Sequence, residues 1–280
     1  MRLSFAGLGV MGFPMAGHLA RAGHDVTVFN RSPDKARSWV ATYGGTLAPS
    51  IAEAARGAEI FLMCVGADDD VRQVVGEAAP ALSAGAVVVD HTTTSALVAR
   101  EMAERVAFVD APVSGGQAGA ENGQLTIMCG ADPATFDRVR PVLEVYGKAV
   151  RRMGPTGSGQ LTKMVNQVCI AGLVQGLAEG LHFASRAGLD PQAVFEAISK
   201  GAAQSWQMDN RWKTMSEGRF DFGFAVDWMR KDLGLVLDEA ARNGAELTVA
   251  RLVDGFYGEI QQMGGRRWDT SSLVARLERP

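Results

Sequence analysis

The N-terminal stretch Met1–Ala20, MRLSFAGLGVMGFPMAGHLA, decides how the first part of this chain folds. Residues 3–6 are typical of a short buried strand, and the residues after the last glycine of the following turn show a helical pattern. That turn consists of Gly7, Leu8, Gly9, Val10, Met11 and Gly12. The first glycine permits a tight bend, the second lets the backbone approach a pyrophosphate, and the third lets helix and strand pack closely. This order predicts a dinucleotide site at the helix N-terminus, with a purely structural turn as the alternative.

The bulk composition is that of an ordinary globular protein. Its 280 residues have room for one large domain or two moderate ones, and 47% of them are hydrophobic and 21% charged. The net charge of -3 gives no reason to expect a nucleic acid or an acidic membrane surface as a partner. Only Met1 and Arg2 precede the first strand, so we expect no signal peptide and a cytoplasmic location. The longest apolar run, 164–178, is interrupted by three amide residues and is expected to be too short to span a bilayer.

Neither the cysteines nor the clustered aspartates indicate a metal site. Cys64, Cys129 and Cys169 are far apart and odd in number, so we expect three small buried residues in a reducing compartment. The three aspartates from Asp68 to Asp70 precede a helical pattern. Consecutive side chains diverge and cannot all face one ion, and carboxylates at a helix start meet unpaired amides. Helix capping is therefore predicted here, and no metal.

The end of the second predicted strand, Asp25–Phe29, bears on the choice of cofactor. Proteins that select NAD usually place Asp or Glu about 20 residues beyond the glycines, where it binds the ribose 2′-hydroxyl. Here Asn30, Arg31 and Ser32 follow instead. The planar guanidinium of Arg31 can pair with a 2′-phosphate, assisted by the Asn30 amide and the Ser32 hydroxyl. NADP(H) is the preferred cofactor, with NAD(H) as the alternative; Arg31 could instead be a solvated loop residue.

Strands and helices continue to alternate as far as about residue 151. The next predicted buried strands are 59–65, 86–90 and 108–111. Val65, Thr93 and Asp110 fall at their carboxyl ends, where ligands bind in open parallel sheets.

A glycine-rich segment then follows the strand at 108–111. Ser114, Gly115 and Gly116 can present a hydroxyl and backbone N–H groups to a carboxylate without an intervening side chain. A flexible hairpin is the alternative, because glycine is the common turn residue. A further strand is predicted at 125–128.

The segment GPTGSG at 154–159 is the predicted boundary between two domains. Before it the pattern is α/β, and after it apolar helices continue to the end without strands. We predict an NADP-binding Rossmann-like domain over 1–160 and an all-α domain over 161–280, joined by a long helix from about 160 to 187. Further helices are predicted at 191–199, 205–215, 226–243 and 248–263.

The start of the long helix offers the chemistry for hydride transfer, which requires a group to move the hydroxyl proton. Lys163 and Asn166 are three residues apart and therefore lie on one face of the helix. Lys163 is a candidate general acid/base, although a solvated surface lysine is an equal alternative on this pattern alone. The rival proton carriers are His18, His24, His91 and His182, for each of which a structural role is favoured.

Glycines also recur every four residues along this helix, at Gly172, Gly176 and Gly180. Such a stripe lets another helix approach closely. Packing within the chain and a seam between two copies explain it equally well.

Several ordered motifs together resemble the β-hydroxyacid dehydrogenases, which include 3-hydroxyisobutyrate dehydrogenase, tartronate semialdehyde reductase and the glyoxylate/succinic semialdehyde reductases. The motifs are GLGVMGFPMAGHL at 7–19, Asn30-Arg31, DHTTTS at 90–95, DAPVSGG at 110–116, GPTGSGQLTKMVNQ at 154–167 and MRKDLGL at 229–235. The resemblance runs nearly end to end. It implies reversible oxidation of a β-hydroxy acid to its semialdehyde by a homodimer or homotetramer that binds a small carboxylic acid.

The resemblance also assigns residues. It makes Lys163 the catalytic acid/base and places the substrate carboxylate on Ser114, Gly115 and Gly116. Asn166, Asp232 and Phe224 become substrate-side residues. The implied cofactor contacts are the turn at 7–12, Asn30, Arg31, Met63, Val65, Thr93 and Lys231.

Three positions depart from the family pattern. His18 and Gln167 stand where asparagine is common, and Ala96 where proline is common. Because Gln167 stands beside Asn166, the sequence does not identify the substrate. The same holds for Gln204, Ser205 and Trp206, which are candidates for the lining of the substrate pocket. Two alternatives therefore remain. One is a member acting on a serine-like β-hydroxy amino acid or an imine, and the other is a non-catalytic NADP-binding interaction module.

Overall fold

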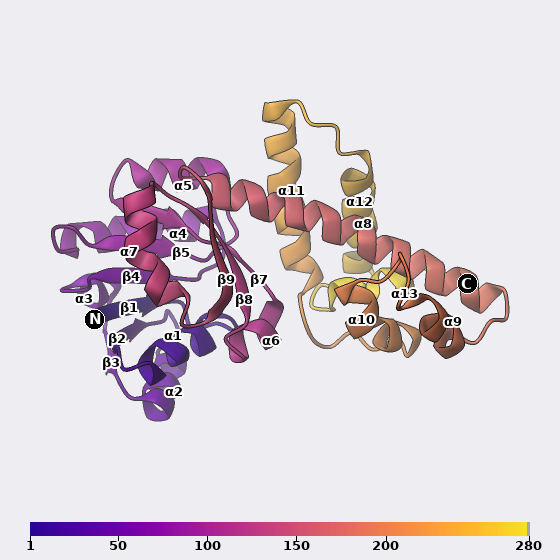
Figure 1. The fold of residues 1–280 in the computed structure, drawn as a ribbon, viewed down its shortest axis with the longest axis horizontal. Helices are drawn as coiled ribbons and strands as arrows, with labels where there is room; N and C mark the ends of the chain where they lie inside the picture. Colours follow the sequence, from indigo (N-terminus) through magenta and orange to yellow (C-terminus); the bar gives the residue numbers. More distant parts are fainter. Residues whose placement is uncertain (279–280) are drawn as a thin grey trace. The chain divides into compact units, whose positions relative to one another are not determined.

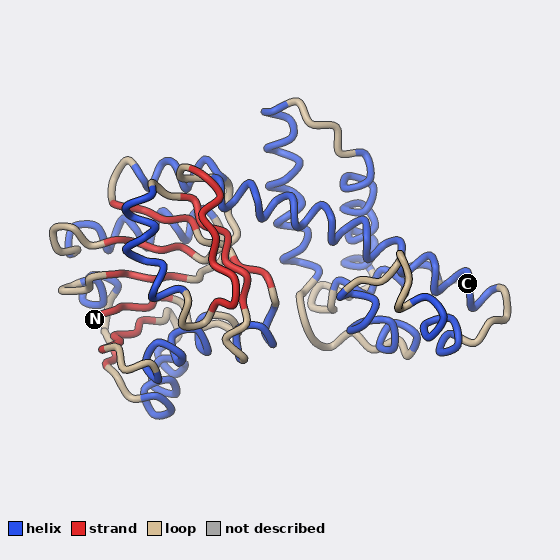
Figure 2. The backbone as a smooth tube through the Cα atoms, viewed as in Figure 1, coloured by secondary structure: helices blue, strands red, loops and turns tan. Residues whose placement is uncertain are grey.

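The computed structural model describes residues 1–278, which form two compact units, Met1–Lys163 and the residues from Met164 onward. Each unit is described by itself. Figure 2 shows that all strands belong to the first unit, whereas the second is built from helices and loops. The architecture is thus the predicted one, a Rossmann-type α/β unit followed by a helical unit. The long predicted helix is α8 (Ser158–Arg186), whose first turns belong to the first unit.

The first unit is organised around a nine-stranded sheet. Six parallel strands lie in the order β3-β2-β1-β4-β5-β6, which is the Rossmann order. Their bounds are β1 (Arg2–Ala6), β2 (Asp25–Phe29), β3 (Thr46–Leu47), β4 (Ile60–Met63), β5 (Val87–Asp90) and β6 (Ala107–Asp110). The order reverses between β1 and β4, so the glycine turn after β1 opens at the crevice where dinucleotides bind.

The far side of the sheet is not parallel throughout. β8 (Leu125–Gly130) runs antiparallel to β6 and to β7 (Val113–Ser114), and β9 (Gly147–Gly154) pairs with β8 in parallel. The glycine-rich segment after β6 contains regular secondary structure. It forms β7 and then α6 (Gly116–Glu121).

Helices cover both faces of the sheet (Figure 1). The strand side chains point alternately to the two faces. Ile60 and Leu62 of β4 point into the core shared with α1 (Gly12–Arg21), α2 (Pro33–Tyr43) and α7 (Pro133–Leu143). Their neighbours Phe61 and Met63 point into the core shared with the helices of the opposite face. Those helices are α3 (Ile51–Ala55), α4 (Asp68–Ala78) and α5 (Ala96–Ala103), and a short 3₁₀ turn, Ala79–Ala81, follows α4. Burial on both faces explains the continuous apolar strand sequences.

The second unit contains one hydrophobic core to which α8 contributes Ala171, Val174, Ala178 and Leu181. Its other helices are α9 (Pro191–Ile198), α10 (Trp206–Ser216), α11 (Val226–Asn243), α12 (Thr248–Gln262) and α13 (Leu273–Leu277), with a 3₁₀ turn at Thr270–Ser272. The four longer predicted helices are present within one or two residues. α13 was not predicted.

The apolar run at 164–178 was expected to be too short to span a bilayer, but it is part of the longer helix α8. This 29-residue helix is long and apolar enough, by length and composition, to cross a membrane. Because one face of α8 forms part of the core of the second unit, a core helix of a globular domain explains the same composition.

Candidate active site

The glycine turn after β1 has the geometry that its sequence predicts. Gly7 has a φ of 94°, and a Cβ there would lie 2.2 Å from the carbonyl oxygen of Cys64. A Cβ on Gly12 would lie 1.9 Å from the carbonyl oxygen of Gly7, so helix α1 packs against the turn as closely as glycine allows. At Gly9, by contrast, no atom of the described residues lies within 4 Å of the Cβ position. The turn thus leaves backbone open for a pyrophosphate beside the N-terminus of α1.

Of the residues after β2, Asn30 is hydrogen-bonded within its loop, whereas Arg31 is exposed. Asn30 is committed to the loop itself, since its Oδ1 accepts a hydrogen bond from the Leu8 N–H at 2.8 Å and its Nδ2 donates to the Ser32 carbonyl at 3.0 Å. The side chain of Arg31 is 91% exposed, and its guanidinium lies 3.7 Å from an Asp70 carboxylate oxygen. Such an exposed pair is weak. Arg31 can therefore turn to another anion while Asn30 holds the turn.

The carboxyl ends of β4 and β5 are tied together by side-chain hydrogen bonds. The Thr92 hydroxyl accepts a hydrogen bond from the Val65 N–H at 2.9 Å. The Met63 side chain is fully buried in the core, so only its backbone faces this edge. Val65 and Thr93 follow the strand ends as predicted, two and three residues after β4 and β5.

His91 is occupied by structural contacts. Its Nδ1 donates to the Ala111 carbonyl oxygen at 2.7 Å, and its Nε2 accepts from the Tyr146 hydroxyl at 2.8 Å. Burial lowers the pKa of His91 to about 4. A neutral imidazole with both nitrogens bonded to protein groups is not a proton carrier near neutral pH, so the structural role favoured for His91 is the one observed.

The lowered pKa of His91 predicts that the stability of the protein depends on pH. Between its unfolded pKa of about 6.5 and its folded pKa of about 4, His91 binds a proton only in the unfolded chain, so stability falls as the pH is lowered. Relative to a His91→Gln variant, the wild-type free energy of unfolding should fall by about 3 kcal/mol between about pH 7 and pH 4.

Urea unfolding of both proteins near pH 7, 5.5 and 4 measures this difference. Burial raises the pKa of Asp110 to about 6, which acts in the opposite direction, but this contribution is common to both proteins and cancels. A difference that stays constant with pH would show that the imidazole titrates normally.

Asp110, the last residue of β6, anchors the start of α8. Its carboxylate accepts hydrogen bonds from the backbone N–H groups of Gly157 at 2.7 Å and Gln160 at 2.9 Å. Two glycines leave room for it, because a Cβ on Gly130 would lie 2.3 Å from its Oδ1 and a Cβ on Gly159 would lie 2.8 Å from its Oδ2. The buried carboxylate thus caps a helix that begins nearly 50 residues further along the chain.

Gln160 adds a second anchor in the same turn of α8. Its amide donates to the Thr92 carbonyl oxygen at 2.7 Å and accepts from the Thr94 N–H at 3.0 Å. The loop that carries Thr93 is thereby fixed to the helix that carries Lys163, one turn further on. Sequence reasoning assigned this anchoring role to neither Asp110 nor Gln160. The available signal was the apolar strand that ends at Asp110, together with the glycines at 157 and 159.

Lys163 is buried, with only 8% of its surface exposed. The alternative of a solvated surface lysine is therefore wrong. A lysine side chain held inside a protein on a doubly anchored helix turn is a candidate for proton transfer.

The substrate-loop residues lie at the junction of β7 and α6. Ser114 pairs with Thr126 of β8, and the next two residues adopt positive φ angles, 131° at Gly115 and 62° at Gly116. No atom of the described residues lies within 4 Å of the Cβ position of Gly116. The segment is a turn between β7 and α6 whose backbone is accessible at Gly116.

In the second unit, Asn166, Gln167 and Asp232 form a hydrogen-bonded chain. Asn166 Nδ2 donates to Gln167 Oε1 at 2.8 Å, and Gln167 Nε2 donates to Asp232 Oδ2 at 2.7 Å. Lys231 Nζ lies 3.2 Å from the other carboxylate oxygen of Asp232 and 5.7 Å from the Trp228 ring centre. Phe224 is partly exposed, and its N–H donates to Asp269.

Other sequence predictions have mixed outcomes. Cys129 is buried, but Cys169 is exposed on α8, so the expectation of three buried cysteines is wrong. Asp70 caps α4 by accepting the Ala67 N–H, whereas Asp68 accepts the Ser95 N–H at the start of α5. His18 is bonded to carbonyl oxygens at the end of α6.

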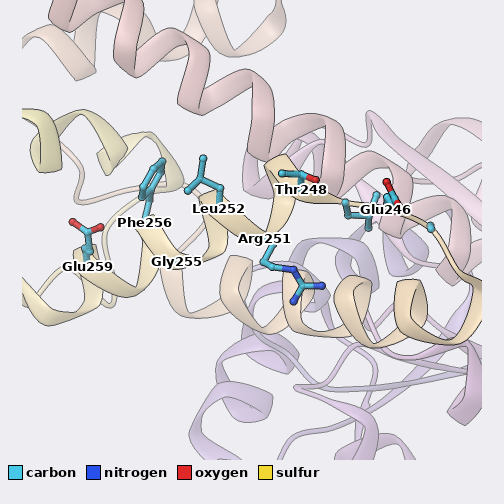
Figure 3. Close-up of a pocket in the computed structure, with 9 residues that line it drawn as sticks. Glu246, Thr248, Arg251, Leu252, Gly255, Phe256 and Glu259 are labelled. Carbon is cyan, nitrogen blue, oxygen red and sulfur yellow. The ribbon is translucent and has the colours of Figure 1, made fainter.

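A hollow of about 810 Å³ runs along α12, and none of the site residues described above lines it. It is lined by residues 245–248, 251, 252, 255, 256 and 259, none of which the sequence assigned to a site. Figure 3 shows Leu252 and Phe256 on one side of the helix and Arg251 on the other. The hollow includes neither the glycine turn after β1 nor Lys163.

Comparison with known proteins identifies both parts of the chain. Residues 2–154 match the family model described as the NAD-binding domain of 6-phosphogluconate dehydrogenase. Residues 157–277 match the model described as NAD-binding of NADP-dependent 3-hydroxyisobutyrate dehydrogenase. The chain is 34% identical to 2-hydroxy-3-oxopropionate reductase of Escherichia coli over 99% of its length and 97% of that protein. The chain belongs to the β-hydroxyacid dehydrogenase family.

Other β-hydroxyacid dehydrogenases and related oxidoreductases extend the match. An uncharacterized oxidoreductase of Shewanella frigidimarina is 64% identical, covering 99% of this chain and 98% of that one. The structure of Mycobacterium tuberculosis 3-hydroxyisobutyrate dehydrogenase with L-serine superposes with a TM-score of 0.91 at 29% identity, covering 99% of each chain. Membership makes the protein an NAD(P)-dependent oxidoreductase of the hydroxyacid dehydrogenase type, a family whose members act on small carboxylic acids.

Proposed function

We propose that the protein is an NADP(H)-dependent oxidoreductase that interconverts a small β-hydroxy acid and its semialdehyde, with Lys163 as the general acid/base. The observation that carries the proposal is the burial of Lys163 on a helix turn anchored by Asp110 and Gln160. In the oxidation direction the Lys163 amine accepts the proton of the reacting hydroxyl. In the reduction direction its ammonium returns a proton to the carbonyl oxygen.

The residues around the glycine turn fit the cofactor. The open backbone at Gly9 and the N-terminus of α1 would hold the pyrophosphate, and Val65 and Thr93 would border the nicotinamide end. When bound, NADP(H) supplies or accepts the hydride. Lys231 is assigned to the cofactor by resemblance alone.

Substrate binding is assigned to the turn after β7. Ser114 offers a hydroxyl, and Gly115 and Gly116 offer backbone N–H groups with little side-chain obstruction. These groups suit a carboxylate. Asn166 lies one helical turn after Lys163 on the same face of α8, where it can contact the substrate near the reacting carbon. Asp232 and Phe224 are proposed as further substrate-side residues.

The test is a set of initial rates with NADPH and NADH against glyoxylate, succinic semialdehyde, methylmalonate semialdehyde and tartronate semialdehyde. We expect efficient reduction of at least one of them with NADPH. A second candidate, oxidation of a serine-like β-hydroxy amino acid, is favoured by the L-serine bound to the Mycobacterium tuberculosis relative. Cofactor binding without turnover of any substrate would favour a non-catalytic NADP-binding module.

Replacing Arg31 tests the cofactor preference. Arg31→Ala should weaken NADPH binding by about 10- to 100-fold, since a charge-assisted pair with the 2′-phosphate is lost, and should leave NADH binding nearly unchanged. Fluorescence titration of both cofactors measures this. Arg37→Ala, on the exposed side of α2, is the control, because Arg37 pairs with Asp34 on its own helix. Equal weakening of both cofactors by Arg31→Ala would place the 2′-phosphate elsewhere.

The same proposal includes a cytoplasmic homodimer or homotetramer. In the glycine stripe on α8, a Cβ added to Gly172 would lie 3.7 Å from Val249, whereas one added to Gly176 or Gly180 would meet no atom of the described residues within 4 Å outside the adjacent backbone of α8. Phe183, on the same helix, is 71% exposed. Packing within the chain therefore does not explain the stripe beyond Gly172, which favours a seam with a second copy.

A further inference from the structure

The amide of Asn166 is held in one orientation by a chain of hydrogen bonds that ends on a carboxylate. Asp232 can only accept hydrogen bonds when ionised, so the amide group of Gln167 must turn its Nε2 toward Asp232, at 2.7 Å. The second hydrogen of that nitrogen is directed at the sulfur of Met229, at 3.7 Å. The donor end of Gln167 is therefore fully used, and its Oε1 must face the other way.

The orientation of the Gln167 amide also fixes that of the Asn166 amide. Gln167 Oε1 is an acceptor, so Asn166 turns its Nδ2 toward it, at 2.8 Å. The reverse orientation would bring two carbonyl oxygens together. Asn166 Oδ1 is thus turned away from Gln167, and it accepts no hydrogen bond within residues 1–278. Gln167 and Asp232 are each only 2% exposed, so water does not compete for the chain, whereas Asn166 is partly exposed.

We infer that Asp232 and Gln167 are positioning residues that make Asn166 present a hydrogen-bond acceptor, one helical turn from Lys163, to a donor on carbon 2 of the substrate. This inference rests on the proposed function, and it names the substrate class of that site. An acceptor there favours a 3-hydroxy acid with a hydroxyl or an ammonium group on carbon 2 over one with a methyl group. A site built to bond a donor rejects the analogue that lacks it, because the acceptor is left unpaired.

Three substrates that differ only on carbon 2 provide the test: glycerate with a hydroxyl, serine with an ammonium, and 3-hydroxyisobutyrate with a methyl. Both enantiomers of each are measured with NADP⁺. The wild type should favour glycerate or serine over 3-hydroxyisobutyrate in kcat/KM. In Gln167→Leu, which frees the Asn166 amide to rotate, this ratio should fall about tenfold, because the donor-bearing substrate binds more weakly and its KM rises. The methyl-bearing substrate should keep nearly its wild-type KM.

Two further variants keep the result interpretable. Asp232→Asn removes the fixed acceptor at the end of the chain and should lower the same ratio, even if Gln167→Leu does not fold. Gln175→Leu is the matched control, because Gln175 is another buried glutamine on α8 bonded to a carboxylate, that of Glu179, but three turns beyond Lys163. Its ratio should equal that of the wild type.

Calorimetric binding of the same three acids to the NADP⁺-loaded protein gives the ratio independently of turnover. Absence of turnover with a preserved binding ratio would defeat the proposed function but support the inference. A wild-type preference for the methyl-bearing acid would overturn it. So would equal losses for all three acids in Gln167→Leu, since an effect on the shared carboxylate would weaken every substrate alike.

Discussion

Lys163→Ala should lower kcat about a thousandfold or more while leaving NADPH binding unchanged. General acid–base groups contribute about 10² to 10⁴ in rate. Lys163 is the one lysine that the structure shows buried at the anchored start of α8. The proposed cofactor contacts of the first unit lie on the turn after β1 and at the ends of β2, β4 and β5, and none depends on the lysine side chain. The loss should therefore appear in turnover rather than in cofactor affinity.

Two companion variants separate proton transfer from packing and charge. Lys163→Met keeps a long apolar stem but has no titratable group, so it should be as inactive as the alanine variant. Lys163→Arg keeps a positive charge that does not dissociate near neutral pH, and it should also be inactive. Steady-state kinetics, NADPH fluorescence titration and thermal unfolding are measured on each. Lys148→Ala, which removes an exposed lysine on β9, is the control and should retain wild-type rates.

Activity in Lys163→Arg close to that of the wild type would contradict the assignment. It would mean that the position supplies only a positive charge. Near-normal turnover in Lys163→Ala would transfer the proton step to another residue, and among the rival carriers His91 is excluded by its two protein partners.

Local sequence signals predicted the parts of the fold that depend on neighbouring residues. The Gly7–Gly12 turn was recognisable because bend, close approach and packing each require glycine at a fixed spacing. The buried strands and the long helix were recognisable from the lengths of their apolar runs. The two-residue strands β3 and β7 and the short helix α6 were missed, because so few residues carry no periodic signal.

Contacts between distant residues could not be predicted in this way. The bonds from Asp110 to Gly157 and from Gln167 to Asp232 join residues 47 and 65 positions apart. Each of these hydrogen bonds forms only when the folded sheet or the packed helices bring the two residues together. The exposure of Cys169 was mispredicted for a related reason, since the face of α8 that a residue occupies is decided by what packs against the helix. The burial of Lys163 likewise depends on tertiary packing.

Gly159→Ala should be strongly damaging, because the start of α8 has no room for the added methyl group. The added Cβ would lie 2.3 Å from the carbonyl oxygen of Met128 and 2.7 Å from that of Asp110. Both oxygens belong to backbone at strands of the sheet, so neither can move aside as a flexible side chain would. We expect a loss of about 3 kcal/mol in the free energy of unfolding, at the upper end of the cost of overpacking.

Activity should fall with it, because the first turn of α8 must shift and Lys163 follows four residues later on the same face. A displacement of about 1 Å is enough for about a hundredfold loss in kcat. Gly234→Ala on α11 is the matched control. No atom of the described residues lies within 4 Å of that Cβ position, so this change should stabilise the protein by about 0.5–1 kcal/mol and leave kcat unaltered.

Urea unfolding and the kcat of the folded fraction distinguish two roles for the close packing of Gly159 against Asp110. If Gly159→Ala lowers stability but the folded protein turns over normally, this packing holds the sheet to α8 without setting the position of Lys163. If both fall, the missing side chain at Gly159 is what allows a buried carboxylate to hold the helix start and the lysine in place. We expect the second result, because the hydrogen bonds from Gly157 and Gln160 to Asp110 leave the first turn of α8 little freedom to relax.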